Sequence, residues 1–593
     1  MTTQPTGFVY GVNGPVVRIR GGNSTDLRMS EMVEVGHNRL MGEIISINRE
    51  ETAAQVFEDT SMLSSGEPVY ATDRPLSITL GPGLVGNIFD GIGRPLRDIE
   101  AAVGAFITKG FRQDVDASSD KKKWAVKMLA EEGQTVVSGQ IVAEIVETPA
   151  IINKVMIPPE ISGTVKSAAK DGEYNANDVL LTVIDANNIA HEITMTQRWH
   201  VRTRRPVKEF MRAETPLITG QRVIDALFPV AKGGMAALPG GFGAGKTMLQ
   251  HQLAKWSDAD IIVYIGCGER GNEMTQVLED FSKLTDPKTG AKLMDRTVLI
   301  ANTSNMPVAA REASVYTGVT IAEYFRDMGY HTAIMADSTS RWAEALRELS
   351  GRLEEMPAEE GFPAYLVSKL AGFYERAGFV KTLGGNEGSI TIIGAVSPQG
   401  ADFSEPVTMQ TKRFVRSFWT LDKNLAYARH FPAVQWLTSY SEYLDNLEDW
   451  YNEHVGREFL NYRAEIIKLL NEESELMEIV KLVGADILPE GQKLTLEISR
   501  VIRLGFVQQN AYTSDSFTPF EKQMKMMGVI LYLYEKCRDL ASKSHPVGEM
   551  RKTGIFDKII AIKHNVGNND EDIASIDNYR NLIDEFHDGF KDK

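Results

Sequence analysis

The sequence predicts a multidomain protein with an N-terminal β-barrel, a small inserted β domain, a central α/β domain with a parallel sheet, and a C-terminal α-helical domain. Three observations predict this architecture. Short β-type runs broken by glycine and proline occupy residues 7–80, strands alternate with helices between about 199 and 440, and helical periodicity follows residue 440. A chain of 593 residues has room for several such domains.

Composition and charge exclude several classes of protein. The apolar and charged contents are ordinary for a soluble globular chain, and no run approaches the ~18 apolar residues that a transmembrane helix needs. The first residues lack the basic and apolar regions of a secretory signal, and two distant cysteines, Cys267 and Cys537, suit a reducing cytoplasm. The formal net charge of −16 argues against a nucleic-acid-binding protein held by bulk electrostatics.

Three regions precede the central domain. Residues 1–75 predict the β-barrel, which holds no recognisable catalytic group and for which we expect a structural or assembly role. Residues 76–109 are rich in turns and predict a connector to the central domain. Residues 110–190 predict the inserted domain, because the segments 133–142 and 172–180 echo each other as turns entering β runs, like the halves of a β-sandwich.

A glycine-rich loop in the central domain matches the pattern Gly-x-x-x-x-Gly-Lys-Ser/Thr. Its residues are Gly240, Gly241, Phe242, Gly243, Ala244, Gly245, Lys246 and Thr247. Such a loop wraps backbone N–H groups around nucleotide phosphates, its lysine contacts the β- and γ-phosphates, and its hydroxyl binds Mg²⁺. An accidental glycine-rich turn is the alternative, but four fixed positions should match by chance only about 0.03 times in a chain this long.

Two carboxylates follow apolar strands of the same predicted sheet. Asp337 ends one strand, where phosphate-loop enzymes keep a carboxylate for Mg²⁺. Glu269 follows another and could orient the attacking water, while the adjacent Arg270 could stabilise charge on the γ-phosphate. Each could also be a helix cap or a solvated loop residue, but two carboxylates in one sheet with the loop favour catalysis. Cys267 is interpreted as a buried packing residue.

Residues 191–440 make up the central domain, and 441–593 the helical domain. Apolar residues such as Phe459, Ile466 and Leu470 recur at helical spacing there, which predicts packed helices.

Four segments together resemble the catalytic A subunit of V/A-type rotary ATPases, along nearly the whole chain. They are residues 239–247, 266–273, 336–342 and 429–434. The resemblance implies a RecA-like nucleotide domain with ATP/ADP and Mg²⁺ as ligands. It also implies that the chain hydrolyses or synthesises ATP in a complex that moves protons or sodium ions across a membrane. Ala244 replaces a redox-sensitive cysteine of eukaryotic relatives, which points to the prokaryotic type.

Matching motifs imply roles for individual residues. Glu269 would activate water, Lys246 and Arg270 would contact phosphate, and Thr247 and Asp337 would bind Mg²⁺. Three further residues lie in similar stretches of the family. Phe431 would stack on adenine, Phe506 would close the other side of the base, and Arg341 would lie at the catalytic site.

The same resemblance implies partners and location. Three copies would alternate with three B subunits in a ring, with central-stalk and peripheral-stalk subunits attached. The membrane sector would be contacted only indirectly, at the cytoplasmic face of the cell membrane, and no nucleic acid is expected.

Two other functions compete with this interpretation. A different RecA-like motor, such as an RNA translocase or a protein-export ATPase, would need a basic, aromatic barrel. The barrel stretch is instead rich in carboxylates, namely Glu31, Glu34, Glu43, Glu50, Glu51, Glu58 and Asp59. A non-catalytic ring subunit is the second alternative, and the intact loop together with Glu269 argues against it.

Overall fold

The computed structural model divides the chain into two compact units. The first comprises residues 1–211, 259–398 and 403–414, and the second comprises residues 212–258, 399–402 and 415–593. The structure describes residues 4–22, 27–49, 51–104, 109–110, 122–286 and 289–591. Residues 105–108 of the predicted connector and 111–121 of the predicted insertion lie outside these ranges. The predicted central region, 191–440, contributes residues to both units.

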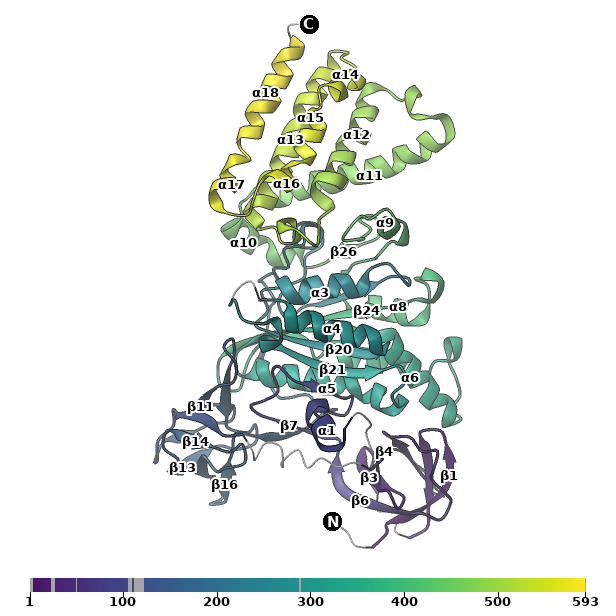
Figure 1. The fold of residues 1–593 in the computed structure, drawn as a ribbon, viewed down its shortest axis with the longest axis vertical. Coiled ribbons are helices and arrows are strands. Elements are labelled where there is room, and N and C mark those ends of the chain that lie inside the picture. Colours follow the sequence, from purple (N-terminus) through teal and green to yellow (C-terminus); the bar gives the residue numbers. More distant parts are fainter. Residues whose placement is uncertain are drawn as a thin grey trace. The chain divides into compact units, whose positions relative to one another are not determined.

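A closed β-barrel begins the first unit, as predicted (Figure 1). Its strands are β1 (Gly7–Asn13), β2 (Val16–Arg20), β3 (Glu31–Val35), β4 (Leu40–Ile47), β5 (Thr52–Val56) and β6 (Pro68–Pro75). They pair antiparallel in the order β1-β2-β5-β4-β3-β6, and β6 returns to β1. Valine and isoleucine side chains such as Val17, Ile19 and Val33 fill the interior, because alternate residues of each strand point inward.

Four of the glutamates counted in the barrel stretch are buried, so they do not contribute charge to the barrel surface. Glu31, Glu34, Glu43 and Glu58 are each less than a tenth exposed. Glu43 accepts a hydrogen bond from Gln55 at 2.8 Å, and its carboxylate also pairs with an arginine outside the barrel. These carboxylates are therefore part of the packing and do not form a surface that repels nucleic acid.

The inserted region forms two four-stranded sheets that share one apolar core. One sheet has the order β12-β11-β9-β14 and the other the order β10-β13-β15-β16. The strands are β9 (Trp124–Met128), β10 (Thr135–Val136), β11 (Ile141–Val146), β12 (Ile152–Met156), β13 (Gly163–Ala168), β14 (Gly172–Tyr174), β15 (Leu181–Ile184) and β16 (Ala190–Ile193). Outside these sheets, β7 (Ser77–Leu80) pairs antiparallel with β17 (Gln197–His200).

A parallel sheet forms the centre of the first unit. Its order is β8-β21-β20-β22-β24, and β23 and β18 continue it antiparallel beyond β24. The strands are β8 (Ile88–Phe89), β18 (Glu209–Met211), β20 (Ile261–Glu269), β21 (Thr297–Thr303), β22 (His331–Asp337), β23 (Gly378–Lys381) and β24 (Glu387–Val396). The helices of this unit are α1 (Leu96–Val103), α4 (Gly271–Lys283), η3 (Leu293–Arg296), α5 (Val308–Asp327), α6 (Thr339–Arg352), η4 (Glu359–Gly361), α7 (Leu366–Tyr374) and α8 (Pro406–Phe414). The predicted alternation of strands and helices is confirmed.

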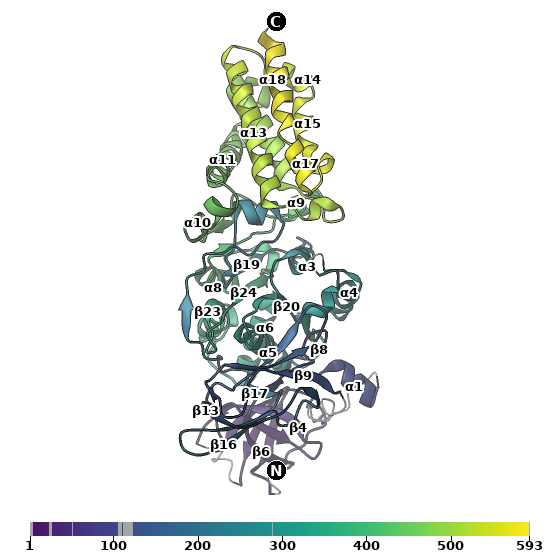
Figure 2. The same ribbon diagram turned by 90° about the vertical axis from the view of Figure 1, so that its left-hand side faces the viewer.

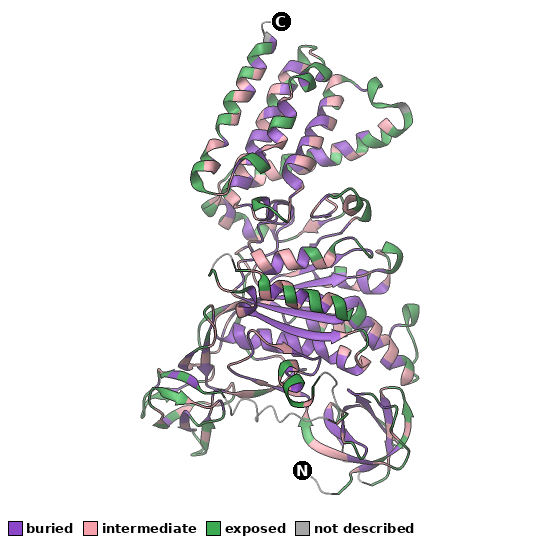
Figure 3. Ribbon diagram, viewed as in Figure 1, coloured by how far each residue is buried: buried purple, intermediate pink, exposed green. Residues whose placement is uncertain are grey.

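Helices cover both faces of this sheet. Strands β21 and β22 lie on opposite sides of β20 in the sheet. The chain passes from β20 through α4 to β21, and then from β21 through α5 back past β20 to β22. Right-handed crossovers in opposite directions place α4 and α5 on opposite faces, as Figures 1 and 2 show. Helix α5 is buried along nearly its whole length (Figure 3).

The second unit combines a short strand cluster with the helical domain. Strand β19 (Met235–Pro239) pairs parallel with β25 (Ser417–Phe418), which pairs antiparallel with β26 (Tyr440–Ser441). The helices are η2 (Val223–Leu227), α3 (Lys246–Trp256), η5 (Gln399–Ala401), α9 (Lys423–Tyr427), α10 (Leu444–His454), α11 (Phe459–Val483), η6 (Ala485–Ile487), α12 (Glu490–Val501), η7 (Ile502–Val507), η8 (Ser514–Ser516), α13 (Phe520–Ser542), α14 (Val547–Lys552), α15 (Ile555–Ile560), α16 (Ile562–Asn565), α17 (Asp570–Ser575) and α18 (Asn578–Lys591). Helices α11, α12, α13 and α18 pack together (Figure 1). Within the described ranges, the helices are all too short or too polar to cross a membrane.

Candidate functional site

The glycine-rich loop connects β19 to α3 in the second unit. Gly243 and Gly245 have φ angles of +77° and +91°, which side chains rarely adopt, and a Cβ at either position would meet open space. Helix α3 starts at Lys246, so the N–H groups of its first turn face the loop. The Lys246 ammonium donates to the carbonyl oxygens of Gly240 at 2.6 Å and Gly241 at 3.1 Å. Phe242 at the loop tip is 78% exposed.

Backbone pairing connects the loop to the segment that contains Phe431. Gly240 forms a parallel bridge with Leu421, and Leu421 forms an antiparallel bridge with Val434. A Cβ on Gly240 would lie 2.8 Å from the Leu421 Cβ, so glycine permits this close approach. The structure therefore brings the predicted phosphate loop and the predicted base-stacking segment together within one unit.

The two aromatic residues predicted for base binding differ in exposure. Phe431 is partly exposed, and its carbonyl oxygen accepts a hydrogen bond from the Gln509 N–H at 2.6 Å. Phe506 is fully buried in η7, so its ring has no exposed face on which a base could stack. The role of Phe506 in base binding stays a prediction, and in this structure the residue belongs to the interior of the second unit.

A buried arginine, Arg222, holds these aromatic segments in place. Its guanidinium donates to the Phe506 carbonyl oxygen at 2.5 Å and pairs with Asp515 at 2.5 Å. The guanidinium also donates to the Gln508 carbonyl at 2.8 Å. The backbone N–H of Arg222 donates to the side-chain oxygen of Gln509 at 2.6 Å. One side chain thus fixes η7 and the turn after it by charge-assisted hydrogen bonds.

The predicted catalytic residues of the first unit lie at the carboxyl ends of neighbouring parallel strands. Glu269 is the last residue of β20 and Asp337 is the last residue of β22. The two strands pair with Gly266 opposite Asp337, which places both carboxylates at the same edge of the sheet. Asp337 is buried and accepts a hydrogen bond from the Tyr264 hydroxyl at 3.3 Å.

Burial and like charge dominate the electrostatics of this edge. Burial raises the pKa of Glu269 to about 8, and the nearby carboxylates of Asp337 and Glu273 act in the same direction as burial. Arg341 acts in the opposite direction. Because carboxylates with raised pKa values cluster at functional sites, this edge is a candidate for chemistry.

The remaining predicted residues surround this edge. Arg270 is exposed and precedes α4, directly after Glu269. Arg341 lies on α6, is about half exposed, and pairs with Glu344 at 2.9 Å. Cys267 is buried, and burial raises the pKa of its thiol to about 12, which agrees with the interpretation of a packing residue.

Sequence patterns did not reveal three contributors to these groups. Tyr264 and Glu273 flank the carboxylates but lie in a strand and a helix where tyrosine and glutamate are ordinary residues. Arg222 is separated from Asp515 by 293 positions, and no spacing rule connects residues so far apart. Glu273 belongs to segment 266–273, one of the four segments that carry the family resemblance, so the sequence offered a signal for this residue alone.

Four family models match the chain. The nucleotide-binding domain of the ATP synthase alpha/beta family matches residues 220–441, and the C-terminal domain of V and A type ATP synthase matches 448–546. The beta-barrel domain of the ATP synthase alpha/beta family matches 9–73, and the barrel-sandwich domain of the ATP synthase alpha/beta chains matches 115–202.

Individual relatives cover nearly the whole chain. The V-type ATP synthase alpha chain of Halothermothrix orenii is 55% identical over 584 residues, which are 97% of this chain and 98% of that protein. The V-type ATP synthase alpha chain 2 of Clostridium tetani is 55% identical over 571 residues, 96% of this chain and 95% of that protein. The assembled ATPase EscN of the enteropathogenic E. coli type III secretion system aligns with a TM-score of 0.63 and 22% identity, covering 88% of this chain and 99% of EscN. That last similarity concerns the fold alone.

The Arg222 contacts predict a large stability loss for a conservative substitution. Lysine cannot reproduce a planar fork of N–H donors, so Arg222→Lys cannot keep all of the contacts to Asp515 and to the carbonyl groups of Phe506 and Gln508. We expect a loss of roughly 3 kcal/mol in the free energy of unfolding, measured by urea denaturation. The control is Arg413→Lys, at an exposed position. A variant as stable as the parent would show that Arg222 does not organise this region.

The raised pKa of Glu269 predicts a pH-dependent effect on stability. Its pKa in the folded chain, about 8, exceeds the ordinary value of 4.5, so folding favours the protonated form. The stability that this group contributes is fully present below pH 4.5 and is lost as pH rises through about 8. Glu269→Gln stays neutral, so without nucleotide and metal it should melt a few degrees above the parent at pH 9 and close to it at pH 4.

Thermal unfolding followed at several pH values provides the measurement for this prediction. Glu279→Gln is the control, since Glu279 lies on the exposed side of α4 and pairs with Lys283. A difference between Glu269→Gln and the parent that is constant across pH would contradict the electrostatic account.

Proposed function

This chain belongs to the family of catalytic alpha, or A, subunits of V- and A-type ATP synthases, and we propose that its glycine-rich loop binds the ATP that Glu269 helps to hydrolyse. Family membership makes the chain a nucleotide-binding component of an ion-translocating ATPase and ATP synthase. The observation that carries the proposal is 55% identity over 97% of the chain, with Lys246 and Glu269 both present in their motifs.

The loop supports the proposed phosphate binding. Open space lies beside Gly243 and Gly245, so phosphate oxygens can approach the backbone N–H groups without meeting a side chain. The Lys246 ammonium rests on loop carbonyls and would exchange these contacts for the β- and γ-phosphates.

Mg²⁺ would be held by the Thr247 hydroxyl and the Asp337 carboxylate. Hard oxygen donors of this kind suit Mg²⁺, which binds few protein groups and keeps water and phosphate oxygens as its other ligands. Among the described residues, His, Cys, Asp and Glu side chains form no cluster of three or more that could hold a metal by themselves. When bound, the ion would neutralise charge on the phosphates.

The proposed chemistry assigns a separate task to each side chain. The Glu269 carboxylate orients the attacking water and accepts its proton, which requires Glu269 to be ionised. Lys246 and Arg270 stabilise negative charge on the γ-phosphate oxygens as the bond to the leaving group breaks. Arg341, whose charge lowers the pKa of Glu269, favours the ionised form and acts as a positioning residue.

Base recognition is assigned to Phe431. Its partly exposed ring offers a face to adenine, and stacking of this kind contributes on the order of 1 kcal/mol beyond simple burial. Phe506, fully buried, would support this region from within through the contacts of Arg222.

The family implies a complex with other subunits. We propose a ring in which three copies alternate with three B subunits, with central-stalk and peripheral-stalk subunits attached. The chain would work at the cytoplasmic face of the cell membrane, in contact with the membrane sector only through other subunits.

A shared active site predicts that the isolated chain is a poor ATPase. Phosphoryl transfer spreads charge over the equatorial oxygens, and an arginine supplied by a neighbouring subunit typically contributes ~10³–10⁵ in rate. The purified monomer should bind Mg-ATP but hydrolyse it roughly 10³-fold more slowly than the complex with the B subunit. Steady-state phosphate release is the readout, with the monomeric state checked by light scattering.

Lys246→Ala measures the background rate from contaminating ATPases in the same preparation. Full activity from a verified monomer would contradict the shared site and would place the chain among self-sufficient phosphate-loop ATPases.

A further inference from the structure

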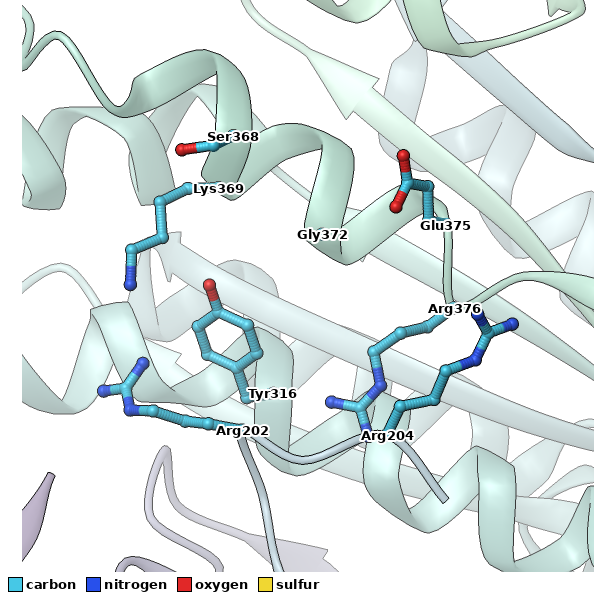
Figure 4. A pocket seen from close by; sticks show the side chains of 8 residues that line it. All are labelled: Arg202, Arg204, Tyr316, Ser368, Lys369, Gly372, Glu375 and Arg376. Atoms are coloured by element: carbon cyan, nitrogen blue, oxygen red, sulfur yellow. The ribbon is translucent and has the colours of Figure 1, made fainter. Parts of the chain in front are cut away.

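A basic pocket of about 260 Å³ lies in the first unit, apart from every residue assigned to ATP hydrolysis. Arg202 and Arg204 enter it from the segment between β17 and β18, Tyr316 from α5, and Lys369 and Arg376 from α7 and the turn after it (Figure 4). Figure 4 shows Lys369 and Arg202 on one side of Tyr316, with Arg204 and Arg376 on the other.

Two of these cations already have carboxylate partners. Arg202 pairs with Glu43 of the barrel at 2.7 Å and with Glu312 of α5 at 2.6 Å. Arg376 pairs with Glu323 of α5 at 2.5 Å. These ion pairs connect α5 to the barrel and to the end of α7, which explains why Arg202 and Arg376 are present without invoking a ligand.

Among the described residues, the other two cations, Arg204 and Lys369, make no ion pair with a carboxylate. The buried Nε and Nη2 groups of Arg204 have no hydrogen-bond acceptor among the described residues. The guanidinium face rests on the Phe210 ring at 4.4 Å, and this stacking leaves its N–H edge available. Lys369 lies beyond ion-pair distance of the carboxylates in the described part of the chain, although its charge helps to lower the pKa of Glu312. Its ammonium lies 5.9 Å from the Tyr316 ring centroid.

Positive charge in this pocket is held at an energetic cost. Burial lowers the pKa of Arg204 from its ordinary value, because desolvation disfavours the charged form. The nearby carboxylates of Glu323 and Glu375 act in the opposite direction, and repulsion from Arg326 and Arg376 acts in the same direction as burial. Glu375 is the one carboxylate that lines the pocket. Buried donors without acceptors destabilise a fold. An anion at Arg204 would accept these hydrogen bonds and would also offset the repulsion from the neighbouring arginines.

The volume and the donor geometry together define the ligand. A pocket of about 260 Å³ exceeds the space of a few water molecules, at ~30 Å³ each, and lies below the usual range for drug-sized ligands. A guanidinium edge matches two oxygens of a phosphate group, and a lysine adds a point charge. We propose that this pocket is an anion site that binds inorganic phosphate or pyrophosphate through Arg204 and Lys369.

The test uses the full-length chain with its glycine-rich loop saturated by Mg²⁺ and a non-hydrolysable ATP analogue. Pyrophosphate and inorganic phosphate are then titrated separately by calorimetry, and the tighter of the two identifies the form that the pocket prefers. Arg204→Gln and Lys369→Gln should each weaken binding by roughly tenfold, because each removes a charge-assisted contact, and the double variant should abolish it. Lys283→Gln, at an exposed position outside the pocket, is the control and should bind like the parent.

Two results would overturn the proposal. One is the absence of binding by either anion at millimolar concentration. The other is unchanged affinity in Lys369→Gln, a partly exposed position without ion pairs among the described residues, whose replacement leaves the buried arginine pairs in place. Equal melting temperatures of the variants and the parent establish that any loss of binding is local.

Discussion

The burial of one carboxylate beside a second, at one edge of a parallel sheet, is the constraint on which the candidate site depends. Parallel pairing of β20 with β22 fixes Glu269 and Asp337 at the same edge, whatever their charge. Burial and this neighbour raise the pKa of Glu269 to about 8, so the ionised form needs nearby positive charge. Arg341 supplies part of it, and a metal ion bound to nucleotide would supply more. In the proposed mechanism, ligand binding and ionisation of Glu269 would therefore be coupled by electrostatics.

Buried arginines provide the rigidity that such a site requires. Arg222 fixes the turn next to the Phe431 segment in the second unit, and Arg202 and Arg376 attach α5 to its surroundings in the first. In each case one guanidinium satisfies several acceptors, which lysine cannot do. The basic pocket next to α5 uses the same side-chain chemistry, but Arg204 and Lys369 make no direct ion pair with a carboxylate among the residues that the structure describes. This difference separates a structural cluster from a candidate ligand site.

The sequence was sufficient wherever the determining interactions are local. The glycine loop, and the carboxylates that end β20 and β22, follow from short motifs and from strands that alternate with helices, and the barrel follows from regularly spaced β runs. The sequence was insufficient where burial depends on distant parts of the chain. Glu43 of the barrel proved to be an interior residue whose partner, Arg202, lies 159 positions along the sequence. Phe506 is likewise fully buried, and its carbonyl accepts a hydrogen bond from Arg222, 284 positions away.

The most direct test of the central claim is ATP turnover by Glu269→Gln in the complex reassembled with the B subunit. The substitution keeps the size of the side chain and removes the charge that polarises water, so nucleotide affinity should be retained while turnover falls by roughly 10²–10⁴-fold. Glu279→Gln on the exposed side of α4 should hydrolyse ATP like the parent. Turnover by Glu269→Gln near the parent rate would contradict the claim that Glu269 is the catalytic carboxylate.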